Sequence, residues 1–369
     1  MDYRKRTLEE LQKHASRIGS RIALIGFDGF IDKIVHPVSQ RQGQGAQFTP
    51  MRTISEFGER ILGAAGKSTN IELFPVMDKL GGNGPIMASA LLAAGMTTRY
   101  IGALGRPQVH GVFHEFADRA QATSIADPSI TTAIEFADGK VMLGNTVSLD
   151  DITFDAIIEH VGEGALVDLF SRADLIGLVN WTMIPNMTAI FTALLARIVP
   201  VLPPRDQRLW FFDLADPEKR SKGDLVVALN TIARFQPHGS VTLGLNLKES
   251  QQVSHALGLP VREPDAAGLK DMARAIRERL AIGTVVIHPK ESAVCANREG
   301  VWSIEGPYTD TPKLTTGAGD HFNAGFVTGQ LLGLSPVACL TLGACFSGCY
   351  VRTARSPSLN DIDAFLRDW

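Results

Sequence analysis

Short runs of consecutive apolar residues recur along the chain, and each run ends at glycine or at a polar residue. Unbroken apolar runs of this length are typical of strands that are buried on both faces of a parallel sheet. The stretches between them are long enough to form helices, so the order of elements predicts βαβ units. We therefore expect an α/β fold with one doubly wound, mostly parallel sheet, whose strands include residues 21–27, 98–105, 175–179, 209–213, 241–245 and 284–287.

Other stretches depart from this pattern. Residues 131–143 alternate apolar and polar positions around Asp138-Gly139, which predicts a hairpin with one solvated face. Residues from about 33 to 80 show no clear period, so we expect them to be irregular. Within them, the polar stretch 40–47 has too few apolar residues to join a packed core and predicts a flexible loop. Near the N-terminus, Thr7-Leu8-Glu9-Glu10 has the sequence of a capping box and predicts that a helix begins there.

Composition and charge narrow the class of protein. The chain has 369 residues, of which 45% are hydrophobic, and its net charge is −3 at pH 7. This balance is typical of a globular protein and supplies no positive field that would hold nucleic acid. No apolar run approaches the ~20 residues that a membrane helix needs, and the first residues are charged. We expect a cytoplasmic protein that binds small molecules, with no nucleic acid and no membrane among its partners.

The most informative motif is a glycine-rich turn, Thr315–Gly325, which carries a carboxylate and enters an apolar segment. Gly317, Ala318 and Gly319 have little or no side chain, so their N–H groups can point at one anion at a helix N-terminus. Asp320 follows directly. A carboxylate repels a resting phosphate, and its presence is explained if it takes a proton from an attacking hydroxyl group. The motif predicts phosphoryl transfer, although taken alone it also fits a helix start with an acidic first turn.

Two further motifs precede this turn. Gly81-Gly82-Asn83-Gly84 opens a helix of small residues, and the missing glycine side chains let a ligand with hydroxyl groups lie against the backbone. Asn246-Leu247-Lys248-Glu249 stands between the two glycine motifs. In this order, the three motifs resemble the ribokinase or PfkB family of carbohydrate and nucleoside kinases. The resemblance extends from Ile22 to about Leu366.

The resemblance implies a single ribokinase-like α/β domain over residues 1–369, with a small β-sheet lid contributed by residues of about 33–80 and 130–148. It implies an ATP-dependent phosphotransferase that phosphorylates a hydroxyl group of a sugar or sugar derivative. Asp320 would be the general base. Residues 316–319 would form an anion hole from backbone donors, with Gly317, Ala318 and Gly319 as catalytic residues.

The same resemblance implies the binding residues. The sugar would be bound by one aspartate after the first strand and by the first glycine motif: Asp28 or Asp32, with Gly81, Gly82 and Asn83. The sequence leaves open which of the two aspartates takes this role. ATP and Mg²⁺ are the expected cofactors. The nucleotide side would be formed by Asn246, Glu249, Thr316 and Asn323, with Glu249 holding Mg²⁺ through water, because this ion dehydrates reluctantly.

The sequence also departs from the family's pattern. Apolar Ile86-Met87 stands near the place of an asparagine that contacts sugar. Leu314 replaces an aspartate that contributes to a monovalent-cation site, which puts a requirement for a monovalent cation in doubt. His288-Pro289 occurs where the family has a Thr-x-Gly near the adenine, so the contacts with ATP there must differ or be weaker.

Several alternatives remain at this stage. A nucleoside kinase of the same family would need an aromatic or apolar platform for the base, and the sequence identifies none. A catalytically silent sugar- or nucleotide-binding protein is motivated by the departures, but Asp320 argues against it because a pure binder gains nothing from a carboxylate that repels phosphate. A dinucleotide-dependent oxidoreductase is disfavoured, since no Gly-x-Gly-x-x-Gly follows the first strand. A homodimer formed through exposed lid strands stays open.

Overall fold

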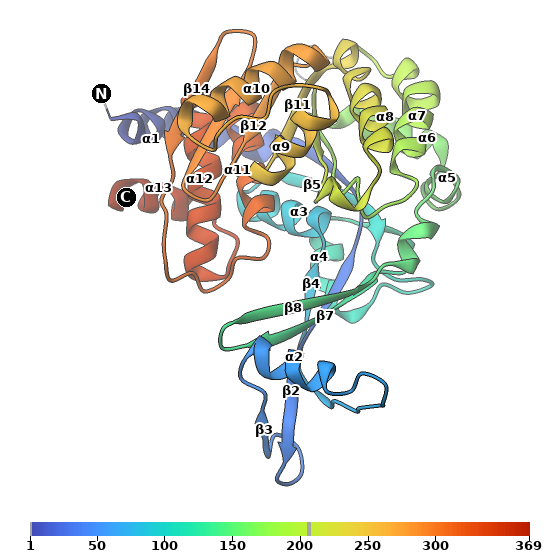
Figure 1. The fold of residues 1–369 in the computed structure, drawn as a ribbon. Helices are drawn as coiled ribbons and strands as arrows, with labels where there is room; N and C mark the ends of the chain where they lie inside the picture. The colour runs from blue at the N-terminus through green and yellow to red at the C-terminus, as the bar shows by residue number, and fades with distance from the viewer. Residues whose placement is uncertain (1, 205–207) are drawn as a thin grey trace.

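The computed structural model describes residues 2–204 and 208–369. Within this part of the chain, the main sheet has nine strands (Figure 1): β1 (Ile22–Phe27), β5 (Thr97–Ala103), β6 (Thr123–Ala126), β9 (Leu175–Leu178), β10 (Leu209–Asp213), β11 (Ser240–Leu245), β12 (Thr284–Ile287), β13 (Ser292–Ala296) and β14 (Val301–Glu305). Their order is β14-β13-β12-β11-β10-β9-β1-β5-β6. Neighbouring strands from β6 to β12 pair in parallel, whereas β13 and β14 add antiparallel pairings at one edge. The predicted doubly wound, mostly parallel sheet is confirmed.

Helices cover both faces of this sheet (Figure 1): α1 (Tyr3–His14), α3 (Asn83–Ala93), α4 (His114–Arg119), α5 (Phe154–Val161), α6 (Glu163–Arg172), α7 (Met187–Ala193), α8 (Lys222–Ala233), α9 (Leu247–Ala256), α10 (Ala266–Leu280), α11 (Ala318–Leu332), α12 (Pro336–Thr353) and α13 (Leu359–Asp368). Successive strand residues point to opposite faces. Leu24 therefore joins a core with α5 to α10, whereas Ala23 and Ile25 join a second core with α1, α3, α4 and α11 to α13. The two cores explain why the strands read as unbroken apolar runs.

A smaller sheet projects from the main body (Figure 1). It consists of β2 (Phe30–Arg41), β3 (Phe48–Pro50), β4 (Leu73–Gly81), β7 (Ser129–Phe136) and β8 (Gly139–Asn145), accompanied by helix α2 (Ile54–Leu62). Strand β2 is central, since it pairs in parallel with β7 and antiparallel with β3 and β4. The hairpin predicted around Asp138-Gly139 is confirmed, because β7 and β8 pair antiparallel on either side of this turn.

The expectation that residues 33–80 are irregular is wrong. Strand β2 is twelve residues long, and β4 pairs with it over most of that length. Its register shifts between Ile34 and Val35 against β4, and again between Val38 and Gln40 against β3. Such irregularities interrupt the alternation of inward and outward side chains, which hid the strand from pattern analysis. The polar stretch 40–47 is the end of β2 and a tight turn that leads to β3.

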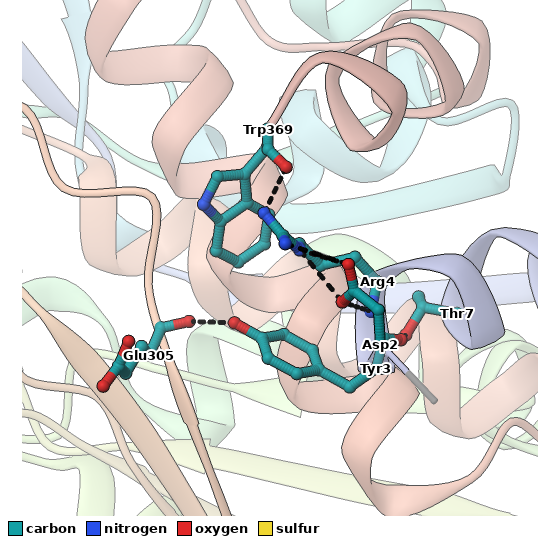
Figure 2. Close-up of polar contacts among 6 residues, drawn as sticks. All are labelled: Asp2, Tyr3, Arg4, Thr7, Glu305 and Trp369. Carbon is teal, nitrogen blue, oxygen red and sulfur yellow. Dashed lines mark hydrogen bonds and ion pairs between the residues drawn. The ribbon is translucent and has the colours of Figure 1, made fainter.

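The two ends of the chain lie side by side (Figure 2). Asp2 caps α1 by accepting a hydrogen bond from the Arg4 backbone N–H at 3.0 Å, so the helix begins at Tyr3. The prediction that it begins at Thr7 is wrong, because Asp2 supplies an earlier cap; the Thr7 hydroxyl instead donates to the Tyr3 carbonyl at 2.8 Å. The Arg4 guanidinium donates to the Trp369 carbonyl, and the rings of Tyr3 and Trp369 meet edge to face. These contacts hold α1 against the end of α13.

Candidate active site

Asp320 lies in the first turn of α11, where Gly317 is the N-cap. Gly317 has a φ of +89°, which side chains disfavour, and a Cβ atom there would lie 3.1 Å from Ile86 Cγ2. First-turn N–H groups have no acceptor within their own helix, and the helix dipole adds positive potential at the same end. The N–H of Ala318 donates to Thr315 O at 3.2 Å, so the candidate donors for an anion are the N–H groups of Gly317, Gly319 and Asp320. We call residues 316–319 the anion loop.

The first glycine motif meets Asp320 directly. Gly82 is the N-cap of α3 with a φ of +100°, and this conformation turns Asn83 toward α11. The Asn83 side-chain amide donates to Asp320 Oδ1 at 2.9 Å. The carboxyl group is only 8% exposed, and burial, followed by the charge of Asp213, raises its pKa well above the usual range. Two motifs 237 positions apart therefore form one site.

Asp28 and Asp32 have different surroundings. Asp28 is completely buried and accepts three hydrogen bonds, from the backbone N–H groups of Asn83 and Gly84 at 2.9 and 2.8 Å and from the Asn180 side-chain amide at 2.7 Å. Burial raises its pKa to about 6, against these hydrogen bonds, which lower it. The carboxylate thereby binds the first turn of α3, which is the turn that presents Asn83 to Asp320.

Asp32 belongs to β2, where it stands opposite Lys79 of β4 and beside Thr131 of β7. Its carboxyl group lies against Gly81, since a Cβ atom on that glycine would come within 2.6 Å of it. Burial raises the pKa of Asp32, whereas Lys79 and a hydrogen bond from Thr131 lower it. The side chain is thus placed on the small sheet, next to the glycine motif, with fewer backbone donors than Asp28 has.

Asn246 and Glu249 form a capping box at the start of α9. The Asn246 side chain accepts from the Glu249 N–H at 2.9 Å, and Glu249 Oε2 accepts from the Asn246 N–H at 2.9 Å. The other carboxylate oxygen, Oε1, accepts from the Asp216 N–H at 2.9 Å. Glu249 is 4% exposed, and burial raises its pKa. The motif therefore fixes a buried carboxylate beside the loop that follows β10.

Asp213 is not among the site residues expected from the sequence. It ends β10 and accepts a hydrogen bond from the Asn323 side-chain amide at 3.0 Å, so α11 also holds this carboxyl group. Burial and then the charge of Glu249 raise its pKa well above the usual range. Asp213, Glu249 and Asp320 thus form a buried acidic cluster. Its position at the end of a buried parallel strand is the sequence signal that would have indicated Asp213.

The anion loop is held from two sides. The Tyr350 hydroxyl donates to the Thr316 carbonyl at 2.9 Å, and its ring stacks on His321 with 3.6 Å between the centroids. His321 Nδ1 lies 2.7 Å from the Gly317 carbonyl, which can only accept, so Nδ1 carries the proton. From the small sheet, Lys140 Nζ donates to the Thr316 hydroxyl. Motif analysis missed Tyr350 and Lys140, because neither belongs to a glycine motif, whereas His321 lies within the Thr315–Gly325 turn but received no role from it.

His288, the departure from the family's Thr-x-Gly, lies next to the anion loop. Its ring stacks on Phe322 at 4.6 Å between centroids, and a Cβ atom on Gly319 would lie 3.4 Å from its Cε1. Burial lowers the pKa of His288 to about 4, so the ring is neutral near pH 7. An uncharged aromatic ring thus borders the side of the loop that faces β12.

The surroundings of the site set some limits. Among residues 2–204 and 208–369, no three His, Cys, Asp or Glu side chains are close enough to hold a metal ion directly. No helix in this part of the chain is long and apolar enough to cross a membrane. A cavity of about 980 Å³ lies at the amino ends of the main-sheet strands, next to the starts of β10 and β11. It is therefore separate from the acidic cluster, which includes Asp213 at the carboxyl end of β10.

Comparison with solved structures identifies the fold. Ribokinase from Thermotoga maritima superposes with a TM-score of 0.62 at 15% identity, covering 94% of this chain and 99% of that one. A mutant of phosphofructokinase-2 from Escherichia coli gives 0.64 at 13% identity, covering 94% and 98%. A nucleoside kinase from Methanocaldococcus jannaschii gives 0.63 at 11% identity, covering 95% and 99%. The ribokinase-like fold is therefore confirmed, and it is common to kinases of sugars and of nucleosides.

Sequence comparison is more specific. A ketohexokinase from Haloferax volcanii is 28% identical over 349 residues, which are 94% of this chain and 91% of that protein. The model of the prokaryotic ketohexokinase family matches residues 5–369. The predicted relation to ribokinase-type sugar kinases is thereby confirmed. The chain is an ATP-dependent sugar kinase and belongs to the prokaryotic ketohexokinase family.

Proposed function

We propose that this sugar kinase transfers the γ-phosphoryl group of ATP to a hydroxyl group of a ketohexose. The acceptor class follows from the family and from the name of the Haloferax volcanii relative. The observation that carries the chemistry is the hydrogen bond from the Asn83 amide to Asp320 at 2.9 Å, because it joins the sugar motif to the phosphate motif. An acceptor hydroxyl group bound at Asn83 would lie within reach of Asp320.

We assign Asp320 as the general base. The acceptor oxygen attacks the γ-phosphorus, the bond from phosphorus to the β,γ-bridging oxygen breaks, and ADP leaves with that electron pair. The proton of the acceptor hydroxyl group passes to Asp320. Because burial raises the pKa of this carboxyl group, its ionised form is a stronger base than an exposed aspartate. The N–H groups of Gly319 and Asp320 would stabilise the charge on the transferring group, as preorganised donors do.

We assign the sugar contacts to Asp32, Gly81, Gly82 and Asn83. Asp28 already accepts three hydrogen bonds and is completely buried, so we propose that it is a positioning residue for α3. Asp32 lies on the small sheet with fewer donors around it, which favours this aspartate as the partner of the sugar hydroxyl groups. In this role the small sheet acts as a lid over the acceptor, with residues of about 33–80 and 130–148 in one domain with the main sheet.

The nucleotide side would be formed by Thr316, Asn323, Asn246 and Glu249. The donor set fits Mg²⁺, because the charge of Glu249 raises the pKa of Asp213 and the charges of Asp213 and Glu249 raise that of Asp320, a repulsion that a divalent cation relieves. When bound, Mg²⁺ neutralises charge on the phosphate oxygens. Glu249 and Asp213 would hold it through water, while Asn323 fixes the Asp213 carboxylate. We assign no monovalent cation, since Leu314 offers no carboxylate.

Two further proposals concern the state of the protein. We propose a cytoplasmic location, because all four cysteines are free thiols, as in a reducing compartment. We also propose a homodimer formed through the small sheet. Exposed apolar side chains on one face of that sheet support it, among them Met77, which is 56% exposed, and Met142, which is 42% exposed.

The proposal is tested by ADP release from Mg·ATP across a panel of ketohexoses, aldohexoses, pentoses and nucleosides. We expect a ketohexose to give the highest kcat/KM, and Asp320→Asn to abolish the stimulation. Preferential turnover of a nucleoside would replace the proposed acceptor with the alternative that the fold also permits. ATP binding without turnover of any acceptor would point instead to a silent binding protein.

A further inference from the structure

Lys140 joins the small sheet to the anion loop. It is the second residue of β8, directly after the turn of the β7–β8 hairpin, and its side chain is exposed. Its ammonium group donates a hydrogen bond to the hydroxyl of Thr316. Thr316 immediately precedes Gly317, the N-cap of the helix that carries Asp320. A full positive charge from the small sheet therefore stands at the mouth of the predicted phosphate site.

The charges around Lys140 define one face of the small sheet. In the strand registers, Lys140 stands opposite Glu135, and Lys79 stands opposite Asp32. Lys79 and Lys140 both act on the Asp32 carboxyl group and lower its pKa, whereas burial raises it. Burial is the largest influence on the pKa of Lys79 and lowers it. The charge of Lys140 lowers this pKa as well, whereas the charges of Asp32 and Glu135 raise it. These four side chains therefore share one space, in which two cations meet two anions.

The partner of Lys140 in the free enzyme is weak. A hydroxyl group is neutral, and an ammonium group forms a stronger, charge-assisted hydrogen bond with a phosphate oxygen. We propose that, when ATP is bound, Lys140 leaves Thr316 and pairs with the γ-phosphoryl group, so that the small sheet supplies a catalytic cation to the transferring group. This inference rests on the proposed function, because it needs the γ-phosphate to lie above the anion loop.

The role of Lys140 is electrostatic throughout the transfer. The ammonium group keeps its proton and donates N–H hydrogen bonds, while Asp320 receives the proton of the acceptor. Negative charge spreads over the equatorial and bridging oxygens as the old P–O bond breaks, so a cation at this place stabilises the transition state more than bound ATP. Losing it should therefore lower kcat more than it changes the KM of the sugar.

The test compares three variants in the full-length enzyme. Lys140→Met removes the charge and keeps most of the side-chain length, Lys140→Arg keeps the charge, and Lys33→Met is the matched control. Lys33 is next to Asp32 on β2, so its side chain points to the opposite face of the small sheet. We expect Lys140→Met to lower kcat about 100-fold, the size typical of one lost electrostatic donor, with the KM of the sugar changed less than about threefold. Lys140→Arg should retain about a tenth or more of kcat, and Lys33→Met should stay within about twofold.

A binding measurement separates this inference from the proposed function. Titration with MgADP and aluminium fluoride, which together imitate the transferring phosphoryl group, needs no turnover of any sugar. We expect Lys140→Met to bind this pair at least about tenfold more weakly than the wild type, while MgADP alone binds equally to both. A Lys140→Met variant with kcat and fluoride-complex affinity near wild type would overturn the inference, as would an equal loss in Lys33→Met. Failure of every sugar in the wild type, with the difference in fluoride-complex binding retained, would overturn the proposed function alone.

Discussion

Two regions of the molecule are constructed differently. One is the carboxyl end of the main-sheet strands, where α11 places Asp320, and we call it the buried edge; the other is the small sheet, which carries Asp32. At the edge, the functional side chains are buried and already bonded: Asp28 is 0% exposed, Asn323 1% and Asp320 8%. On the small sheet, Met77 is 56% exposed, and the ammonium group of Lys140 has only a hydroxyl group as its described partner. The first region is preorganised by the fold, whereas the small sheet combines one buried carboxyl group, Asp32 at 9% exposed, with exposed side chains that have few partners.

This difference follows from the chemistry of each region. A base and an anion hole must be in place before charge develops, because reorganising dipoles during the reaction would raise the barrier. Holding these groups in place in advance requires burying them, and burial together with neighbouring carboxylates raises the pKa values of Asp213 and Asp320. Side chains that recognise the sugar and close over it must instead leave room for exchange of substrate and product. The predictions below test this contrast.

The largest effect is expected for Asp320→Asn. The amide keeps the size of the side chain but cannot take the proton, so kcat should fall by about 10³-fold or more, while MgADP binds as in the wild type. Turnover with the preferred sugar and calorimetric titration with MgADP measure the two quantities. Asp32→Asn is the matching variant on the small sheet. Its main effect should be a higher KM of the sugar. Near-normal kcat in Asp320→Asn would remove this residue as the base.

The second prediction concerns pH and the buried edge. A carboxyl group whose pKa is raised in the folded protein binds its proton more tightly there than in the unfolded chain, so its contribution to stability is lost as the pH rises through the folded value. For Asp28 this window runs from about pH 4 to about 6, and it is worth up to ~3 kcal/mol. Asp213 and Asp320 extend the same trend to higher pH.

Urea unfolding of the ligand-free enzyme between pH 7 and 8.5 measures this trend, because below this range the buried neutral rings of His288 and His321 make stability rise with pH. We expect the free energy of unfolding to fall as the pH rises, and Asp320→Asn to show a shallower fall because one of the contributing groups is gone. A free energy that rises across this range in the wild type would contradict the assignment of buried carboxyl groups with raised pKa values.

The third prediction compares the loss of stability caused by alanine at two glycines, one in each region. Gly82 at the edge and Gly45 in the turn of the small sheet both have positive φ angles, +100° and +60°. A Cβ atom on Gly82 would lie 2.9 Å from Asp28 Oδ2, whereas none of the described atoms lies within 4 Å of one on Gly45. Gly82→Ala should cost about 2–3 kcal/mol and reduce kcat, because it displaces Asn83. Gly45→Ala should cost about 1 kcal/mol, the penalty of the backbone conformation alone. Equal losses in thermal unfolding would show that Asp28 does not constrain this turn.

Much of the buried edge was predictable from sequence, because its signals are local. The unbroken apolar runs identified the parallel strands, and the glycine-rich turn before Asp320 correctly predicted that a helix begins there. The small sheet was harder. Its long strand β2 changes register twice, so no single period describes it, and residues 33–80 were expected to be irregular. The hairpin at Asp138-Gly139 was found because its turn and its alternation agree.

The partners of the local motifs were beyond sequence reasoning. Asp213 joins the site because the order of strands brings the end of β10 to α11, and Lys140 because the hairpin reaches across to Thr316. The residues next to Asp213 and Lys140 in the sequence give no sign of either contact. The choice between Asp28 and Asp32 likewise depended on counting hydrogen bonds, since both aspartates follow the same strand and have the same local chemistry.

The smallest effect on catalysis is expected from the exposed apolar side chains of the small sheet. Met77 stands opposite Ile34, two residues from the pair Lys79 and Asp32, so it lies on the same face as Asp32. Met142, two residues from Lys140, continues that face and is 42% exposed. Apolar surface beside a substrate site is stabilised if a second copy of the sheet covers it.

The double variant Met77→Ser, Met142→Ser removes this apolar surface without adding charge next to the lysines. Each of the two copies loses two apolar side chains, so at about 1–2 kcal/mol per side chain the dimer loses about 4–8 kcal/mol. The dimer dissociation constant should therefore rise by about 10³-fold or more, as light scattering after size exclusion would measure. We expect kcat to change less than about twofold, because the buried edge does not depend on these residues. A wild type that is monomeric at all concentrations would exclude the dimer, and a large loss of kcat in a monomeric variant would mean that the edge is completed by the small sheet of the partner.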